Sequence, residues 1–267
     1  MDIPIILLVM STTFRNGNYI LEPVPFLKWA GGKRSSLPEL VARIPAKFTR
    51  YFEPFAGGGA LFFEIWERVK AALLSDTNFE LVVTYNVVKK NPERLMALLD
   101  EHAKRHSKDY YYRIREQHDL QDPIKIAARF IYLNKTCYNG LYRVNKQGHF
   151  NVSIGSYVNT TLYDRENILV CSKALQVARI EVRDFDTITP EAGDFVYCDP
   201  PYHPASQTAS FTGYTKADFS EEDHTRLRDF ALRLTKKGVL VMASNSDTPL
   251  VRKLYGAPPF KIEVVQE

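Results

Sequence analysis

The chain has 267 residues, of which 45% are hydrophobic and 25% charged, and its net charge is +4. These totals exclude wholesale disorder and allow one large core, or one core with an inserted subdomain. Three cysteines without a C-x-x-C spacing argue against a disulfide framework and a zinc cluster. We therefore expect no metal and a cytoplasmic location.

The first segment is an amino-terminal extension, residues 1–23. It contains an apolar run at residues 3–10 that is too short to span a bilayer and has no basic region before it. An extra strand, or a start codon placed too early, accounts for this run better than a membrane anchor does.

A strand, a glycine-rich turn, a helix and a second strand come next. Residues 50–55 read as a short strand that runs into three glycines, and apolar residues at helical spacing follow from Leu61. Residues 71–76 read as a second strand, which ends in an acid. A strand–helix–strand unit of these lengths predicts a parallel sheet.

The rest of the chain predicts an interrupted α/β protein. A long, mostly helical region covers residues 81–172, and within it Leu141–Val152 predicts a hairpin of two short strands. A helix is then expected at 221–237, and strands at 178–185, 194–198, 238–244 and 260–265. The sequence thus predicts a Rossmann-like, mostly parallel sheet formed by residues 24–80 and 175–267, with an inserted region at 81–174.

Positive charge is concentrated in the inserted region. Residues 102–150 hold ten Lys or Arg and four Asp or Glu, a local charge of +6, so the remainder sums to −2. The same span carries eight Tyr or Phe. This mixture suits the phosphates and unstacked bases of a nucleic acid, and it equally suits a solvated charged face over an aromatic core.

Residues with chemical potential fall at the carboxyl ends of predicted strands, where open α/β sheets bind ligands. Gly57, Gly58 and Gly59 allow a ligand to approach the backbone closely. Asp76 follows in the position of an acid that accepts hydrogen bonds from both hydroxyls of a ribose. Together they predict a nucleoside cofactor.

Two other nucleotide sites fit less well. A dinucleotide site needs a glycine where Phe62 stands, which disfavours a nicotinamide-dependent enzyme. A phosphate loop needs glycine in place of Leu27 and Ser or Thr in place of Arg34.

The sequence "DPPY" (Asp199–Tyr202) predicts a site for a planar amine. Asp199 offers a carboxylate, Pro200 leaves nearby carbonyls without a competing N–H, and Tyr202 offers a ring for stacking. Two acceptors that hold both hydrogens of an amine favour a pyramidal, nucleophilic nitrogen. The same residues would also suit a strand that ends in a proline turn. The glycine turn and the ribose-type acid favour the functional interpretation.

Seven segments, in order, resemble the DNA adenine methyltransferase (Dam) family. They are "FLKWAGGK" (26–33), "EPFAGGGALFF" (53–63), "LSDTN" (74–78), "LNKTCYNGLYRVNKQGHFNV" (133–152), "YCDPPY" (197–202), "FTGYTKADFSEEDH" (211–224) and "SNSDTPLVRKLY" (244–255). The resemblance implies a methyltransferase sheet with an inserted DNA-recognition lobe and S-adenosylmethionine as methyl donor. It also implies a monomer that acts on double-stranded DNA at the nucleoid, methylating a flipped adenine within GATC.

The resemblance also assigns roles residue by residue. The cofactor pocket is expected to contain Trp29, Lys33, Phe55, Gly57, Asp76, Asp184, Phe185 and Asp199. The catalytic residues are expected to be Asp199, Pro200 and Tyr202. Arg143 matches the arginine that reads a guanine, Tyr138 matches the aromatic residue inserted into the duplex, and Asn139 lies beside it.

Two departures from the family pattern leave alternatives open. Ser153 stands where the family usually has proline, so base contacts from this loop do not follow from the resemblance. The chain stops at "FKIEVVQE", where the family usually continues with a further strand, so we expect an exposed sheet edge. One alternative is therefore a truncated, catalytically impaired DNA-binding relative. Another is a methyltransferase for a different planar amine, such as a glutamine, although those enzymes typically carry Asn in place of Asp199.

Overall fold

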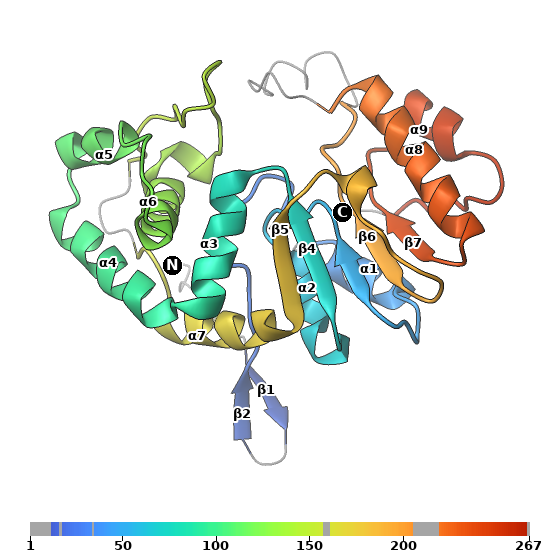
Figure 1. Cartoon of the computed structure of the whole chain (residues 1–267), viewed down its shortest axis with the longest axis horizontal. Helices are drawn as coiled ribbons and strands as arrows, with labels where there is room; N and C mark the ends of the chain where they lie inside the picture. Colours follow the sequence, from blue (N-terminus) through green and yellow to red (C-terminus); the bar gives the residue numbers. More distant parts are fainter. Residues whose placement is uncertain (1–11, 16–17, 34, 157–160, 205–218, 266–267) are drawn as a thin grey trace, which may run out of the picture.

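The computed structural model describes residues 12–15, 18–33, 35–156, 161–204 and 219–265. A five-stranded sheet occupies the middle of the molecule, with α4, α5 and α6 on one side and α8 and α9 on the other (Figure 1). With η for 3-10 helices, the order is β1 (Thr12–Arg15), β2 (Asn18–Leu21), α1 (Leu37–Arg43), β3 (Tyr51–Glu53), α2 (Ala60–Ile65), η1 (Trp66–Arg68), β4 (Ala72–Asp76), α3 (Phe79–Lys90), α4 (Pro92–Arg105), α5 (Lys108–Arg115), α6 (Pro123–Thr136), η2 (Tyr138–Gly140), α7 (Arg165–Ala174), η3 (Leu175–Val177), β5 (Ala178–Val182), η4 (Phe185–Thr187), β6 (Phe195–Cys198), α8 (Glu221–Lys236), β7 (Leu240–Ala243) and α9 (Pro249–Tyr255).

All five strands of the central sheet are parallel, in the order β5-β4-β3-β6-β7. This confirms the predicted Rossmann-like α/β class. The chain order runs one way from β3 through β4 to β5 and the other way from β6 to β7, so the direction reverses between β3 and β6. The carboxyl ends of strands at such a switch point form the usual ligand site of this class.

Alternate residues of the central strands enter two separate cores. Tyr51 and Phe195 are buried in the larger core, which also contains residues of α2, α3 and α6. Their neighbours Phe52 and Val196 are buried in the smaller core, together with residues of α8. Successive side chains of a strand point to opposite faces, so apolar residues at every position indicate a sheet covered on both sides.

The inserted region packs on the sheet through α3, which contacts both β5 and α6. A buried ion pair strengthens this junction: a guanidinium nitrogen of Arg129 lies 2.7 Å from a carboxylate oxygen of Glu80. Arg129 is 3% exposed and also donates to the carbonyls of Ile114 and Arg115. Because α3 belongs to both packing units, the boundary at residue 81 remains a prediction.

The two strands predicted within Leu141–Val152 are wrong in extent. The predicted hairpin is present, within a hairpin loop (residues 137–154) that has two isolated antiparallel bridges, Cys137 with Ile154 and Val144 with Phe150. Further backbone hydrogen bonds join Arg143 to Asn151 and Asn145 to His149. Aromatic packing takes the place of a longer ladder, since the ring of Tyr142 lies 5.9 Å from that of Phe150.

The strand predicted at residues 260–265 is also wrong, because this segment has no regular structure. Its alternating apolar residues are exposed; Val264, for example, is 64% exposed. A strand needs a neighbour to accept its backbone hydrogen bonds, and among the described residues β7 pairs with β6 alone. Among the described residues β7 is the edge strand of the sheet, and Leu240 within it is 38% exposed.

The amino-terminal extension contributes the antiparallel hairpin β1–β2, which projects away from the sheet in Figure 1. The strand expected at residues 3–10 lies outside the described residues. Within the described ranges, none of the helices has the length and apolar character needed to cross a membrane.

Candidate active site

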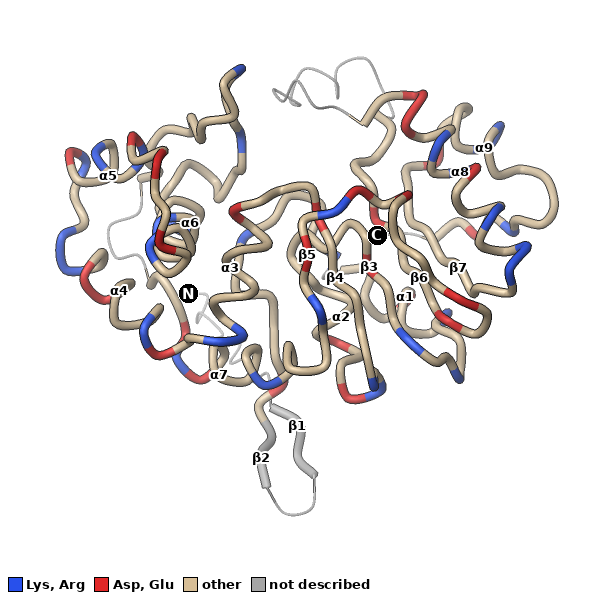
Figure 2. The backbone as a smooth tube through the Cα atoms, viewed as in Figure 1, with Lys and Arg blue, Asp and Glu red and all other residues tan. Residues whose placement is uncertain are grey.

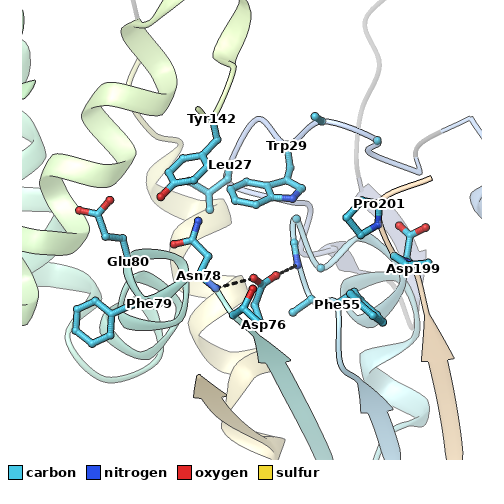
Figure 3. A pocket seen from close by; sticks show the side chains of 18 of the residues that line it. Leu27, Trp29, Phe55, Asp76, Asn78, Phe79, Glu80, Tyr142, Asp199 and Pro201 are labelled. Carbon is cyan, nitrogen blue, oxygen red and sulfur yellow. Dashed lines mark hydrogen bonds between the residues drawn. The ribbon is translucent and has the colours of Figure 1, made fainter. Parts of the chain in front are cut away.

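The carboxyl ends of β3, β4 and β6 open into one cavity of about 1440 Å³. In Figure 3, Phe55 lies between Asp76 and Asp199 along this edge. All ten side chains or glycines predicted for cofactor binding or catalysis line it: Trp29, Lys33, Phe55, Gly57, Asp76, Asp184, Phe185, Asp199, Pro200 and Tyr202. The structure thus brings together residues that are scattered over most of the sequence.

The glycine turn between β3 and α2 requires glycine for steric reasons. Gly57 has a φ of +44°, and a Cβ there would lie 2.8 Å from Nε1 of Trp29. Gly59 has a φ of +67°, and its Cβ would lie 2.8 Å from the hydroxyl of Tyr85. That hydroxyl donates to the carbonyl of Gly57 at 3.0 Å. The turn is therefore fixed, and its backbone is open to a ligand.

Asp76, the last residue of β4, is held by two backbone donors. Its Oδ2 accepts from the N–H of Gly57 at 3.1 Å, and its Oδ1 accepts from the N–H of Asn78 at 2.9 Å (Figure 3). Burial raises the pKa of Asp76, and these donors act in the opposite direction. The backbone of Thr77 donates to the same carboxylate, so one of its four lone pairs remains for a donor from the cavity.

The indole of Trp29 links the glycine turn to the hairpin loop. It stacks on Tyr142, with 5.6 Å between ring centroids and 26° between ring planes. Tyr142 in turn packs on Phe130 of α6, with centroids 5.6 Å apart. In Figure 3 the rings of Trp29 and Tyr142 lie above Asp76, so the lobe supplies part of the cavity wall.

Stacked phenylalanines form the wall next to η4. The rings of Phe55 and Phe185 are 5.3 Å apart with 27° between planes. Arg226, on α8, fixes this wall: its guanidinium lies 4.9 Å from the ring centroid of Phe185 and donates to Asp184 at 3.0 Å and to Asp186 at 2.8 Å. Sequence reasoning missed Arg226, because only the fold brings α8 next to η4.

Asp199, the first residue after β6, forms a buried ion pair with Lys33. Lys33 Nζ lies 2.9 Å from Asp199 Oδ2, and Lys33 is 6% exposed. Burial raises the pKa of Asp199, although the charge of Lys33 acts in the opposite direction. Burial, the largest single effect, would lower the pKa of Lys33, but the charge and hydrogen bond of Asp199 together with those of Tyr202 outweigh it, and the pKa is raised. The two groups therefore stabilise each other in their charged forms.

Two hydroxyls complete the surroundings of Asp199. Ser244 donates to Asp199 Oδ1 at 2.9 Å, and the hydroxyl of Tyr197 lies 2.7 Å from Ser244 Oγ. The sequence placed Ser244 in a family segment without giving it a role. The available signal was positional, because Ser244 is the last residue of one predicted strand and Asp199 follows directly after another.

Glu53 is a further acid in the cavity wall that sequence reasoning missed. It is 3% exposed and accepts a hydrogen bond from the hydroxyl of Tyr51 at 2.9 Å. Burial, reinforced by the nearby charge of Asp199, raises the pKa of Glu53 to about 8. At neutral pH this side chain is therefore largely uncharged.

Tyr202 is turned toward the cavity mouth, not into the protein interior. It is 37% exposed, and Lys33 Nζ lies 4.5 Å from its ring centroid. Lys33 lies against one face of the Tyr202 ring, so the opposite face can stack on a flat ligand. The ring therefore stands beside the Asp199–Lys33 pair, at the entrance rather than the floor of the cavity.

The residues predicted to contact DNA lie outside the cavity, on the hairpin loop. Tyr138 is 56% exposed, and Asn139 follows it with a φ of +52°. Arg143 is half-buried; its Nε donates to Asn151 Oδ1 at 2.7 Å, and its Nη2 donates to the carbonyl of Asn151 at 3.3 Å. The carbonyl of Ser153 accepts from the N–H of Tyr138 at 2.9 Å. The residue that departs from the family pattern therefore helps to hold the backbone of the hairpin loop.

Comparison with known proteins agrees with this geometry. The model of the D12 class N6 adenine-specific DNA methyltransferases matches residues 29–267. The chain is 45% identical over 240 residues to the type II methyltransferase M1.LlaDCHI of Lactococcus lactis subsp. cremoris, covering 86% of this chain and 84% of the relative. It is 41% identical to the type II methyltransferase M.MjaIII of Methanocaldococcus jannaschii, covering 88% and 89%. It is 36% identical to the DNA adenine methylase of Escherichia coli K12, covering 86% and 83%.

These matches span nearly the whole chain and decide between the alternatives drawn from the sequence. A nicotinamide-dependent enzyme and a methyltransferase for protein side chains are both excluded as the family of this chain. Methyltransferases of this kind generally use S-adenosylmethionine as methyl donor. The chain belongs to the D12 class of N6 adenine-specific DNA methyltransferases.

Proposed function

We propose that the cavity binds S-adenosylmethionine, with its ribose on the Asp76 carboxylate. The fit rests on the donors and acceptors of the wall: an anchored carboxylate, a glycine turn without side chains, and the stacked rings of Phe55 and Phe185. Acidic groups at Asp76, Asp184 and Asp199 suit a cationic ligand. Bound there, this cofactor supplies an electrophilic methyl group on a sulfonium.

Asp199 and the carbonyl of Pro200 hold the two hydrogens of an adenine amine in this proposal, while Tyr202 stacks on the base. The Asp199 carboxylate has four lone pairs and accepts from Lys33, Ser244 and Tyr202, so one lone pair remains for the amine, which supports its role as an acceptor. The bound cofactor would supply the methyl group and remain as a neutral thioether, and the Asp199 carboxylate would accept the proton that the amine nitrogen loses. Positioning supplies most of the acceleration.

The target adenine must leave the duplex to reach Asp199, because the cavity lies below the protein surface. Figure 2 shows Lys and Arg along α4 and α5 and on the hairpin loop, where they can contact phosphates. The exposed ring of Tyr138 can occupy the space that the flipped base vacates. We further propose that Arg143, whose guanidinium is held by Asn151 on the same hairpin loop, reads a guanine of GATC.

One chain supplies every residue that this proposal uses, so we propose that a single copy acts on duplex DNA. Cys137, Cys171 and Cys198 are buried free thiols, which suits a reducing compartment. We therefore place the enzyme in the cytoplasm with chromosomal DNA as its substrate.

Transfer of label from S-adenosylmethionine tests the proposal. The protein is incubated with labelled cofactor and unmethylated duplex DNA that carries one GATC, and the product is digested with nucleases sensitive to GATC methylation. Label on adenine and an altered digestion pattern are expected, with no label on a matched duplex that lacks GATC. Label on both duplexes would refute the GATC assignment. DNA binding without label would instead favour the catalytically impaired relative.

A further inference from the structure

Lys33 and Ser244, which come from distant parts of the chain, each contact one oxygen of the Asp199 carboxylate, and the hydroxyl of Tyr202 also hydrogen-bonds this group. Lys33 Nζ lies 2.9 Å from Oδ2, whereas the hydroxyl of Ser244 donates to Oδ1 at 2.9 Å. Tyr197 extends the second contact, because its hydroxyl lies 2.7 Å from Ser244 Oγ. A carboxylate held through both oxygens cannot turn freely about its carbon–carbon bond.

The strand register delivers Ser244 to Asp199. In the parallel pair β6–β7, Cys198 is opposite Ala243, and the N–H of Ser244 donates to the carbonyl of Cys198 at 3.0 Å. Asp199 and Ser244 are thus the first residues beyond two paired strand ends. Sites carried by paired strands hold their geometry more closely than sites carried by loops.

One arrangement of protons satisfies the hydrogen bonds that link Asp199, Ser244 and Tyr197. An ionised carboxylate can only accept, so Ser244 uses its single proton toward Asp199. The hydroxyl of Tyr197 must then donate to Ser244 Oγ. Tyr197 is 1% exposed and burial raises its pKa, so it stays protonated as this arrangement requires.

We propose that Ser244, supported by Tyr197, is a positioning residue for methyl transfer, which fixes the Asp199 carboxylate so that its remaining lone pair faces the adenine amine. This inference rests on the proposed role of Asp199. Neither hydroxyl needs to touch the substrate. A fixed Asp199 carboxylate should lower the barrier at the transition state, where the nitrogen lone pair must align with the methyl group. A carboxylate that turns freely would lose that alignment.

Loss of the Ser244 donor also changes the acidity of Asp199. The titratable groups that face Asp199 from neighbouring elements are Lys33, Glu53, Tyr197, Cys198 and Tyr202. Hydrogen bonds to the charged form of a carboxyl lower its pKa, so removal of one should raise it. The acid limb of the rate profile should then move to higher pH, because only ionised Asp199 is a full acceptor.

The test compares Ser244→Ala, Ser244→Thr and Tyr197→Phe with wild type. The control is Ser172→Ala, which removes a buried hydroxyl on α7 that donates to the carbonyl of Lys89 at 3.1 Å, away from the cavity. Ser244→Ala should lower kcat roughly 10- to 100-fold, the worth of a hydrogen bond to a charged group, and leave the Kd for cofactor and DNA unchanged. Ser244→Thr should restore kcat, Tyr197→Phe should have a smaller effect, and the control should match wild type.

A second readout is independent of turnover. Carbon-13 NMR titration of the aspartate carboxyls should give a higher pKa for Asp199 in Ser244→Ala than in wild type. An unchanged kcat, or a rise in KM with kcat intact, would overturn the inference, and so would an unchanged Asp199 pKa. If Ser244→Ala does not fold, Tyr197→Phe decides the question, since it removes only the hydroxyl that orients Ser244.

Asp199→Asn is measured in parallel to separate this inference from the proposed function. An inactive Asp199→Asn with a fully active Ser244→Ala would reject the positioning role and leave the role of Asp199 standing. An active Asp199→Asn would instead reject the proposed role of Asp199 itself.

Discussion

The cavity and the hairpin loop (residues 137–154) are held in place by different means. Strand register fixes the cavity: Asp76 and Asp199 lie at the ends of paired parallel strands, and each has hydrogen-bond partners on both oxygens. The hairpin loop has only two isolated bridges, and Tyr138 at its base is 56% exposed.

This difference indicates a division of labour within one enzyme. Bond making needs groups held to within a fraction of an ångström, and paired strands provide that precision. Recognition of a DNA sequence needs side chains that reach beyond the protein surface, and an exposed loop provides that reach. Substitutions in the cavity should therefore change turnover on every DNA sequence, whereas substitutions in the hairpin loop should change which sequences are methylated.

The largest effect is expected for Asp199→Ala. Loss of the acceptor that holds the amine should lower kcat by about 10³-fold on any DNA sequence, while DNA affinity stays at the wild-type level. Single-turnover methylation and gel-shift binding on the same duplexes measure the two quantities. An alanine variant that keeps activity, or loses DNA binding in proportion, would remove the distinction between the two regions.

Asp76→Ala should have the next largest effect. The variant loses the anchored carboxylate that we assign to the cofactor ribose, so cofactor affinity should fall roughly 10- to 100-fold. Sequence preference should not change. Calorimetric titration with S-adenosylmethionine gives the affinity, and a melting curve shows whether the glycine turn survives the loss of its acceptor. Unchanged affinity in a folded variant would contradict the assignment.

Arg143→Ala tests the hairpin loop. Discrimination is measured as the ratio of kcat/KM between GATC and a duplex with the guanine replaced. The free energy that corresponds to this ratio should fall by about 1–3 kcal/mol, the usual value of a bidentate arginine–guanine contact. Lys146→Ala is the matched control, because Lys146 is an exposed cation on the same loop. Lys146→Ala should weaken binding to all sequences alike. It should also reduce the slope of log binding constant against log salt concentration by the amount expected for about one phosphate contact. A uniform loss for Arg143→Ala would contradict the reading role.

The last prediction concerns the pH dependence of stability and the buried acid Glu53. Its pKa in the folded protein is about 8, compared with an ordinary 4.5, so between these values the folded state binds more protons than the unfolded chain. The free energy of unfolding should therefore fall as pH rises through this window, by up to about 1.4 kcal/mol per pH unit.

Glu53→Gln should flatten this dependence, because the amide does not titrate. Urea unfolding at pH 5, 6, 7 and 8 measures the slope for wild type and variant. Glu64→Gln, on the exposed side of α2, is the control and should keep the wild-type slope. Equal slopes for wild type and Glu53→Gln would show that the cavity wall does not hold an uncharged acid.

Much of this architecture could be predicted from local signals. Apolar runs of strand length mark β3, β4, β5 and β6, and the three glycines before Ala60 mark the turn that opens α2. The acids at the carboxyl ends of strands were also evident, because a parallel sheet collects such ends at one edge. The segment at 260–265 has the same local pattern and forms no strand, because pairing depends on a neighbour that the pattern does not specify.

The sequence by itself determined which chemical groups reach the edge of the sheet, because strand ends, glycines and prolines act through the backbone of a few adjacent residues. Only the tertiary structure decided which groups touch. It brought Ser244 and Lys33 to opposite oxygens of Asp199, and it placed Arg226 against Phe185. Such contacts join residues far apart in the chain, and they depend on the order and register of strands, which no single segment encodes.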